Sequence, residues 1–192
     1  MRHIPLGRGA VALVDDADFP WLTSMGSWRL NSSGYAVHYA THNSHRRTLY
    51  MHRLILKPDP GIQVDHINRD RLDNRRENLR FATRSQNQAN KGLPINNTSQ
   101  YKGVSWRKGK WEARIRYKDT RLYLGRFEQA QDAALAYDVA SRQLYGDFAG
   151  CNLPEQLVTD SIREMTLARL ARRLTVGANE ITCVTILEAS LS

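Results

Sequence analysis

The stretch 64–87 holds side chains whose types and spacing suit the hydrolysis of a phosphodiester. Asp65 and His66 stand side by side. Asn78 follows twelve residues after His66, and Asn87 follows nine residues later. A neutral imidazole can take a proton from water near neutral pH, and carboxylate and amide oxygens suit a hard cation such as Mg²⁺. The pattern therefore predicts a metal-assisted site with His66 as base and oxygen ligands from Asp65 and Asn87.

The same stretch has the pattern of two short strands. Residues 63–67 and 78–82 are rich in strand formers, the second range alternates apolar and polar residues, and polar turn residues follow the first. Neighbouring residues of a strand face opposite sides. The spacing alone therefore does not bring Asp65 and His66 into one site unless the strand ends or twists between them.

A helix is expected after the second strand. Thr83 and Gln86 have the spacing of a capping box, which places Asn87 near the first turn of a helix that stops at Gly92. Asn87 then points either to a metal or, as an ordinary exposed helix residue, to solvent. Asn78 has a similar alternative as a turn asparagine.

These residues resemble the HNH endonuclease family, in particular homing-type members whose last motif histidine is replaced by asparagine. The resemblance implies that Asp65 and Asn87 bind Mg²⁺ or Mn²⁺ and that His66 is the general base. It also implies that Asn78 braces a ββα-metal hairpin and orients His66. The segments IPL, VALVDD and MHRLIL extend the resemblance over most of residues 1–92.

Three residues near the motif are further candidates for DNA contacts: His52, Arg80 and Arg84. Many family members carry a similar HRL segment, whose histidine packs beside the site or meets a phosphate. The alternative for His52 is a buried histidine at the start of a helix. His38, His42 and His45 lack ligand spacing and are expected to face solvent or contact the DNA backbone.

The composition agrees with a nucleic-acid partner. The chain of 192 residues has 28 Lys and Arg against 19 acids, a formal charge of +9, although charge alone does not separate DNA from RNA or an anionic membrane. Without an apolar run of membrane length or a signal peptide, the protein is expected to be cytoplasmic, in a phage-infected cell, with no membrane partner. Cys151 and Cys183 indicate neither a zinc ribbon nor a disulfide framework.

A second module follows the breaker-rich linker 93–99. Three alternating segments, 103–107, 111–117 and 121–127, predict an antiparallel sheet, and a stripe of small residues predicts a helix packed on it. Between Lys102 and Arg126 there are nine Lys and Arg against two acids. A cationic sheet of this size fits the DNA major groove.

The segments YKGVSW, WEARIRY, YLGRF, AALAYDVA and GDFAGCNLP resemble the APETALA/ethylene-response-factor DNA-binding domain. Base preference does not transfer, because plant members often have arginine in place of Ser105 and an acid in place of Arg114. Trp106 and Trp111 either pack the sheet or touch DNA. The family's DNA-facing positions correspond to Lys102, Ser105, Arg107, Arg114, Arg116, Arg121 and Tyr123.

The sequence thus predicts an α+β protein in which a ββα-metal HNH nuclease domain precedes a three-stranded antiparallel sheet packed on one helix. The expected parts are the nuclease domain 1–92, the linker 93–99, the DNA-binding domain 100–153 and a tail 154–192 that is weakly helical or partly disordered. We expect a metal-dependent homing endonuclease that cleaves or nicks duplex DNA and needs no small-molecule cofactor. A monomer is favoured, although the sequence does not fix the oligomeric state. The alternatives are a DNA-binding regulator with an inactive nuclease half and, less favoured, an RNA-binding module.

Overall fold

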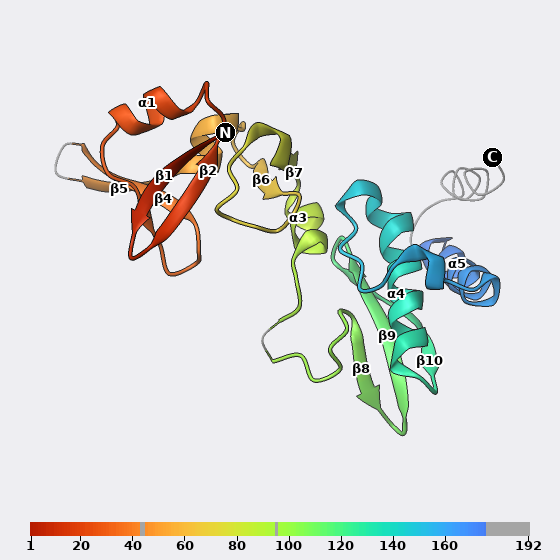
Figure 1. The fold of residues 1–192 in the computed structure, drawn as a ribbon. Helices are drawn as coiled ribbons and strands as arrows, with labels where there is room; N and C mark the ends of the chain where they lie inside the picture. Colours follow the sequence, from red (N-terminus) through yellow and green to blue (C-terminus); the bar gives the residue numbers. More distant parts are fainter. Residues whose placement is uncertain (43–44, 95, 176–192) are drawn as a thin grey trace. The chain divides into compact units, whose positions relative to one another are not determined.

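The computed structural model describes residues 1–42, 45–94 and 96–175 (Figure 1). The chain divides into two compact units, Met1–Asn90 and Lys91–Ser192, called here unit 1 and unit 2. Each unit has its own hydrophobic core, built from helices and small antiparallel sheets. This mixture agrees with the α+β class. Within the described ranges, no helix is long and apolar enough to cross a membrane.

Unit 1 begins with a hairpin and a short helix. Strands β1 (Arg2–Gly7) and β2 (Ala10–Val14) pair antiparallel, and their alternate apolar residues enter the core. Helix α1 (Phe19–Ser24) adds Leu22 to that core. The indole Nε1 of Trp28 donates a hydrogen bond of 2.8 Å to the Leu22 carbonyl, so this buried indole has a polar partner.

A three-stranded antiparallel sheet follows in unit 1. Its order is β3 (Arg29–Leu30), β4 (Ala36–His42) and β5 (His45–Tyr50). Helix α2 (Met51–Leu56) follows β5 directly and buries Met51 in the core of unit 1. The chain therefore passes from the sheet into α2 without a loop.

The predicted hairpin and helix of the motif are present. Strand β6 (Gln63–His66) pairs antiparallel with β7 (Leu79–Ala82), with Asp65 opposite Arg80. Helix α3 (Arg84–Asn90) follows. A short 3-10 turn, η1 (Arg76–Asn78), precedes β7, so the second strand begins one residue later than the predicted range 78–82.

The predicted capping box starts α3. The backbone N–H of Thr83 donates to Oε1 of Gln86 at 2.8 Å, and the N–H of Gln86 donates to Oγ1 of Thr83 at 3.2 Å. Two amides of the first turn thereby gain partners, which fixes where the helix begins. The local sequence signal is confirmed here.

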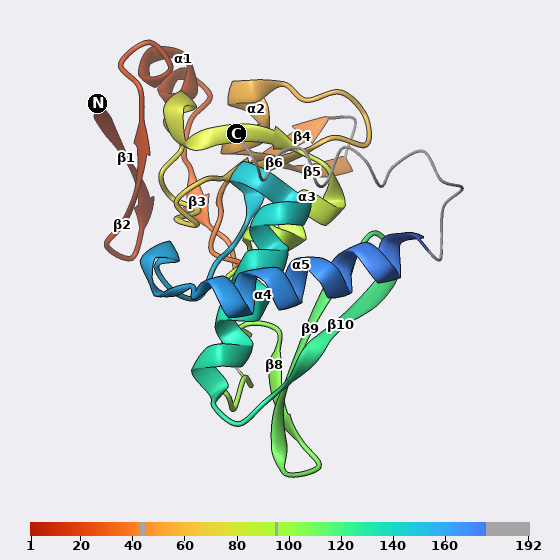
Figure 2. The same cartoon turned by 90° about the vertical axis from the view of Figure 1, so that its right-hand side faces the viewer.

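Unit 2 contains the second sheet. Strands β8 (Val104–Arg107), β9 (Lys110–Tyr117) and β10 (Thr120–Phe127) pair antiparallel in the order β10-β9-β8. Helix α4 (Ala130–Tyr145) shares a core with them (Figure 2). Its small residues allow close approach to the sheet. Those in the core are Ala133, Ala134, Ala136 and Ala140.

A further helix belongs to the core of unit 2. Helix α5 (Asp160–Thr175) packs on α4 and β10, and its Leu170 is only 1% exposed. A guanidinium N–H of Arg169 donates to the Leu124 carbonyl at 2.5 Å. The described part of the expected tail 154–192 thus contributes to the core. The sequence also allows either an edge strand or an unstructured end over 181–187, a range that lies outside the described residues, as does Cys183.

A buried carboxylate joins the two ends of this module. Asp138 of α4 accepts hydrogen bonds of 2.8 Å from the backbone N–H groups of Asn152 and Leu153. The Asn152 side chain in turn accepts from the N–H of Lys102, at 2.6 Å. Burial raises the pKa of Asp138, while the hydrogen bonds from Asn152 and Leu153 oppose that rise. The segment after α4 is thereby fixed beside the start of the sheet.

Gly103 provides a test of this packing. It has a φ of +75°, and an added Cβ would lie 2.0 Å from Cδ2 of Tyr137 and 2.6 Å from the Arg114 carbonyl oxygen. Gly109 has a similar φ of +77° but nothing within 4 Å. Gly109→Ala should cost only the left-handed strain, about 1–2 kcal/mol. Gly103→Ala should cost roughly 1–3 kcal/mol more through overpacking. Chemical denaturation measures both, and equal losses would contradict the predicted contact.

Candidate active site

Asp65 is buried between β7 and α3. Its side chain is 5% exposed, and its Oδ2 accepts from the Nε and Nη2 of Arg80 at 2.9 and 2.8 Å. The Nδ2 of Asn90 lies 3.1 and 3.0 Å from Oδ1 and Oδ2 of Asp65 and donates to the His66 carbonyl at 2.8 Å. A guanidinium and an amide thus hold this carboxylate, which satisfies the rule that buried charges are paired.

Asn87 lies on the same side of β6 as Asp65. Its Nδ2 donates to Oε1 of Gln63 at 2.7 Å. Gln63 and Asp65 are two residues apart on a strand, and Asn87 and Asn90 are three apart on a helix, so each pair shares a face. The two faces are in contact: the Asn87 amide bonds to Gln63, and the Asn90 amide bonds to Asp65.

His66 faces the other side of β6, as strand alternation predicts. Its ring centroid lies 5.1 Å from that of His52 in an edge-to-face arrangement and 6.0 Å from that of Tyr35. The ring is 4% exposed, and its Nε2 has no hydrogen-bond partner among the described residues. Buried polar atoms are rarely left unpaired, so such an atom is a candidate for a bound water or a reacting group.

Both imidazoles favour the neutral form. Burial lowers the pKa of His66, while the Asn74 side chain and the Asp65 carboxylate act in the opposite direction. Burial, reinforced by the charges of His66 and Arg53, lowers the pKa of His52 to about 3. Each neutral ring keeps one nitrogen that can accept a proton or hydrogen bond.

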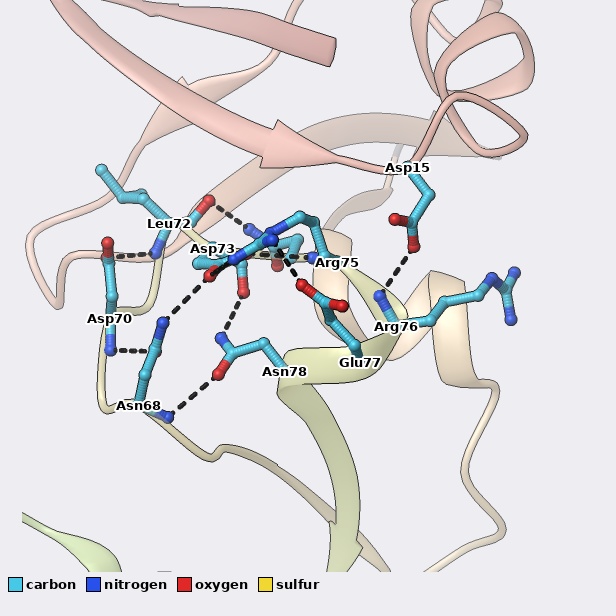
Figure 3. A network of polar contacts seen from close by, with 10 residues as sticks. Asp15, Asn68, Asp70, Leu72, Asp73, Arg75, Arg76, Glu77 and Asn78 are labelled. Carbon is cyan, nitrogen blue, oxygen red and sulfur yellow. Dashed lines mark hydrogen bonds and ion pairs between the residues drawn. The ribbon is translucent and has the colours of Figure 1, made fainter. Parts of the chain in front are cut away.

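The loop between β6 and β7 is braced by Asn78 (Figure 3). The Oδ1 of Asn78 accepts from the N–H of Asn68 at 2.9 Å, and its Nδ2 donates to the Asp73 carbonyl at 2.8 Å. Asn68 also donates to the Asp73 carboxylate at 2.9 Å. These contacts close the loop on itself. They support Asn78 as a brace, although its contacts are with the loop and not with the His66 ring.

The same loop is joined to β2. The N–H of Leu13 donates to the Leu72 carbonyl, and the N–H of Asn74 donates to the Leu13 carbonyl, both at 2.8 Å. The carboxylate of Asp15 accepts from the N–H of Arg76 at 2.8 Å (Figure 3). The first hairpin of the chain therefore supports the loop that leads out of β6.

Several arginines of the motif have internal partners. Arg75 pairs with Asp73 at 2.7 Å, and Arg76 pairs with Asp18 at 2.7 Å. Arg80, predicted from sequence as a DNA contact, pairs with Asp65, whereas Arg84 at the start of α3 is exposed. Three arginines of the motif thus form ion pairs with carboxylates of unit 1 that hold the site together.

A hard cation fits the donor set beside β6. The side chains of Asp65, Asn87 and Gln63 offer carboxylate and amide oxygens, and Mg²⁺ usually takes only one or two protein ligands. Within residues 1–42, 45–94 and 96–175, no group of three or more His, Cys, Asp or Glu is placed to hold a metal ion. A cation here would therefore depend on Asp65, amide oxygens and the phosphate of a substrate.

Unit 2 presents a separate cationic face. In the register of its sheet, Arg116 lies opposite Arg121, and Arg114 opposite Tyr123. The intervening residues of β9 and β10 enter the core with α4, so these side chains point away from α4. The exposed residues of the predicted DNA-facing set are Ser105, Arg107, Arg114, Arg116 and Arg121, while Lys102 and Tyr123 are half-buried.

Glu112 lies among these cations. It is 2% exposed, and its carboxylate pairs with Arg114 at 2.7 Å and with Arg126 at 3.5 Å. The pairing orients Arg114. Arg116, two residues further along β9, has no acidic partner within the described part of the chain. Trp111 packs on the core, and Trp106 lies 5.0 Å from it, 56% exposed.

Three contributors to the site were missed by sequence reasoning. The Asn90 amide donates to the Asp65 carboxylate, and the Tyr35 ring lies against the rings of His52 and His66. The Asn74 side chain acts to raise the pKa of His66. Asn90 could have been found from its spacing, because it lies about one helical turn after Asn87 and so shares its face of the helix. Nothing in the local sequence indicated Tyr35, which comes from a turn 31 residues before His66.

This chain resembles known proteins of two kinds, HNH endonucleases and plant dehydration-responsive element-binding proteins. A family model described as HNH endonuclease matches residues 50–89, the segment that contains β6, β7 and all of α3 except Asn90. An uncharacterised HNH endonuclease of Acanthamoeba polyphaga mimivirus is 31% identical over 151 residues, which cover 76% of this chain and 76% of that protein.

Plant proteins share a shorter region with the chain. Dehydration-responsive element-binding protein 2D of Arabidopsis thaliana is 53% identical over 70 residues, 35% of this chain and 34% of that protein. Dehydration-responsive element-binding protein 2E of Oryza sativa subsp. japonica is 55% identical over 67 residues, 33% of this chain and 21% of that protein. The chain spans about a third or less of the length of these two relatives.

The viral relative covers most of both chains, and the family model falls on the hairpin and helix that carry Asp65, His66, Asn78 and Asn87. The protein belongs to the HNH endonuclease family.

Proposed function

We propose that this protein is a metal-dependent endonuclease of the homing type that hydrolyses phosphodiester bonds in duplex DNA. The observation that carries the proposal is the buried His66, whose Nε2 lacks a described partner, next to a carboxylate that faces α3. Unit 1 would cut, and the cationic face of unit 2 would recognise sequence. The relative in a virus supports the view that the gene belongs to a mobile element.

Strands β6 and β7 and helix α3 form the ββα-metal unit in this proposal. Asp65 and Asn87 would hold the Mg²⁺ or Mn²⁺ ion, with the remaining positions left to water and phosphate. When bound, the ion supplies positive charge that stabilises the phosphoryl oxygens and the departing 3′ oxygen. All other steps belong to the side chains of the chain itself.

His66 takes the proton of the attacking water. Its lowered pKa keeps the ring neutral near pH 7, as a base must be, and its unpartnered Nε2 is the atom for this role. Asn78 holds the loop that follows His66, so the exit of the chain from β6 is fixed. His52, neutral and in ring contact with His66, keeps bulk water from one side of the base.

Arg80 and Asn90 position Asp65. The guanidinium of Arg80 balances the carboxylate charge, and the amide of Asn90 spans from the Asp65 side chain to the His66 backbone. Binding of a cation would change the partner of the carboxylate from Arg80 to the metal ion. Asn90 can keep its contact with the His66 carbonyl throughout, which holds the strand end in place.

Unit 2 is proposed to bind double-stranded DNA through Lys102, Ser105, Arg107, Arg114, Arg116, Arg121 and Tyr123. The names of the plant relatives describe binding to a dehydration-responsive element, which supports this role. In this proposal the protein acts as a monomer in the cytoplasm of a phage-infected cell. The alternative function is a DNA-binding regulator with an inactive nuclease half. Such a regulator would also bind DNA through the face of unit 2, but it would not depend on His66.

The first prediction distinguishes an active endonuclease from a DNA-binding regulator. His66→Ala should lower the rate of cleavage of supercoiled DNA with Mg²⁺ by about 10²–10⁴-fold, the usual contribution of a general base. Asp65→Ala should also abolish cleavage, because it removes the carboxylate ligand. Both variants should bind duplex DNA nearly as the natural chain does. The exposed His3→Ala is the matched control and should cut normally.

Two outcomes would contradict the nuclease proposal. One is cleavage by His66→Ala at the rate of the natural chain. The other is a natural chain that binds duplex DNA but leaves it intact with Mg²⁺ or Mn²⁺, which is the behaviour expected of the regulator.

The second prediction concerns Asn90. Asn90→Ala removes the amide between α3 and the Asp65 carboxylate and should cost about 10–100-fold in metal affinity or activity, as loss of a supporting partner typically does. The half-saturating Mg²⁺ concentration for cleavage should rise. Gln88→Ala, an exposed change on the same helix, is the control. An unaltered Mg²⁺ dependence in Asn90→Ala would remove Asn90 from the site.

The third prediction concerns Arg116 on the face of unit 2. In a full-length His66→Ala background, Arg116→Ala should weaken binding to duplex DNA. A base contact should cost roughly 1–3 kcal/mol and relax preference at one base pair. A phosphate contact should weaken all duplexes and lower the salt slope by about one. Titration of a selected and a scrambled duplex at two salt concentrations distinguishes these cases.

The control for Arg116 is Arg173→Gln. Arg173 is exposed in the last turn of α5, a helix packed on α4 and β10. Identical affinities for Arg116→Ala and Arg173→Gln on every duplex would show that this face does not read DNA.

A further inference from the structure

The region from α1 to α2 carries positive charge without any acid of its own. Residues 19–58 contain five Lys and Arg and four His, but no Asp or Glu. Within the described ranges, the ion pairs involve none of Arg29, Arg46 and Arg47. All three are exposed. Their charges therefore act on solvent or on a ligand.

The strand register brings two of these arginines to one face of the sheet. Thr41 lies directly opposite Arg46, and Val37 lies opposite Arg29. Opposed residues share a face, as do residues two and four apart along a strand. Val37, Tyr39 and Thr41 of β4 therefore lie on one face together with Arg29 and Arg46. Arg47 points to the other face.

A cavity of about 370 Å³ lies at this end of the sheet and is lined by Ser27, Arg29, His38, Tyr39, Thr41 and Arg46. His38 stands between Val37 and Tyr39 and belongs to the other face by alternation, so the cavity reaches past the face that carries Arg29 and Arg46. The Arg46 guanidinium lies 4.0 Å from the centroid of the Tyr39 ring, which orients it. The lining combines two guanidinium groups with hydroxyl donors and an imidazole. Guanidinium groups bind phosphate oxygens through paired N–H donors, so this chemistry fits a phosphate.

The face leads toward the base. Tyr50, at the end of β5, lies opposite Val37 and so belongs to the same face. Its ring centroid is 5.6 Å from that of His52, which is 5.1 Å from that of His66. Ring contacts thus run from Tyr50, on the same face of the sheet as Arg46, through His52 to His66, the proposed base.

Three of the six arginines in the motif 64–87 take part in ion pairs among the described residues, and Arg69, Arg71 and Arg84 do not. Arg75, Arg76 and Arg80 are paired with Asp73, Asp18 and Asp65. A phosphodiester beside His66 needs neighbouring phosphates to be held, since phosphate contacts fix the register of a protein on a duplex. The face of β3, β4 and β5 adds the guanidinium groups of Arg29 and Arg46, which are in no ion pair of the described residues.

We propose that the face carrying Arg29, Tyr39, Thr41 and Arg46 is a second DNA-binding surface, which binds the phosphate backbone next to the bond to be cut. The inference rests on the proposed function in assuming a DNA substrate. It adds that unit 1 holds DNA itself, without base recognition, independently of the face of unit 2. The surface sets the register of the cleaved strand.

The test is the salt dependence of DNA binding by the full-length chain in EDTA, with a mixed-sequence duplex of fixed length as probe. Each phosphate contact contributes about 0.9 to the slope of log affinity against log salt concentration. Arg29→Gln combined with Arg46→Gln should lower that slope by about two, and each single change by about one. The pair Arg29→Lys and Arg46→Lys should keep most of the slope, because the charges remain.

The matched control is Arg8→Gln combined with Lys57→Gln. It removes the same charge from two exposed positions of unit 1, in the β1–β2 turn and at the end of α2, outside the proposed surface. Its slope should equal that of the natural chain. Equal slopes for the Gln pair and this control would overturn the proposal. Because EDTA prevents cleavage, the result is independent of whether the natural chain cuts DNA.

Discussion

The proposed active site depends on the match between one face of β6 and one face of α3. Side chains two apart on the strand, Gln63 and Asp65, meet amides three apart on the helix, Asn87 and Asn90. Only a helix that starts at a fixed residue can make both contacts, so the capping box at Thr83 has a functional role. A shift of α3 by one residue would turn both amides away from the strand and leave Asp65 to Arg80 alone.

The sequence was sufficient for elements whose signals are local. The strands around Asp65 and Leu79, the helix start at Thr83 and the outward face of β9 all follow from alternation, turn residues and capping. Strand alternation predicted that Asp65 and His66 diverge unless the strand ends or twists between them, whereas the resemblance to HNH endonucleases placed both in one site. The structure has Asp65 against α3 and His66 against His52 and Tyr35.

The remaining features come from contacts between distant residues. The pairing of Arg80 with Asp65 is set by strand register, and its sequence position alone equally suited a DNA contact. Helix α5 has a weak apolar pattern, so its packing through Leu170 depends on the core that α4 and β10 provide. Tyr35 reaches the site only because β4 and β5 lead back to α2. Such placements require the tertiary fold.

The distribution of arginines explains how one small unit can both fold and hold a polyanion. Arg75, Arg76 and Arg80 of the motif pair with buried carboxylates, where removal of either partner would leave an unpaired charge. In the acid-free region 19–58, Arg29, Arg46 and Arg47 are exposed and in no ion pair of the described residues, whereas Arg53 is half-buried and donates to the Ile62 carbonyl. If the proposed surface binds DNA, charge for stability and charge for binding are carried by different segments, and changes to Arg29 or Arg46 should alter DNA affinity without loosening the frame around His66.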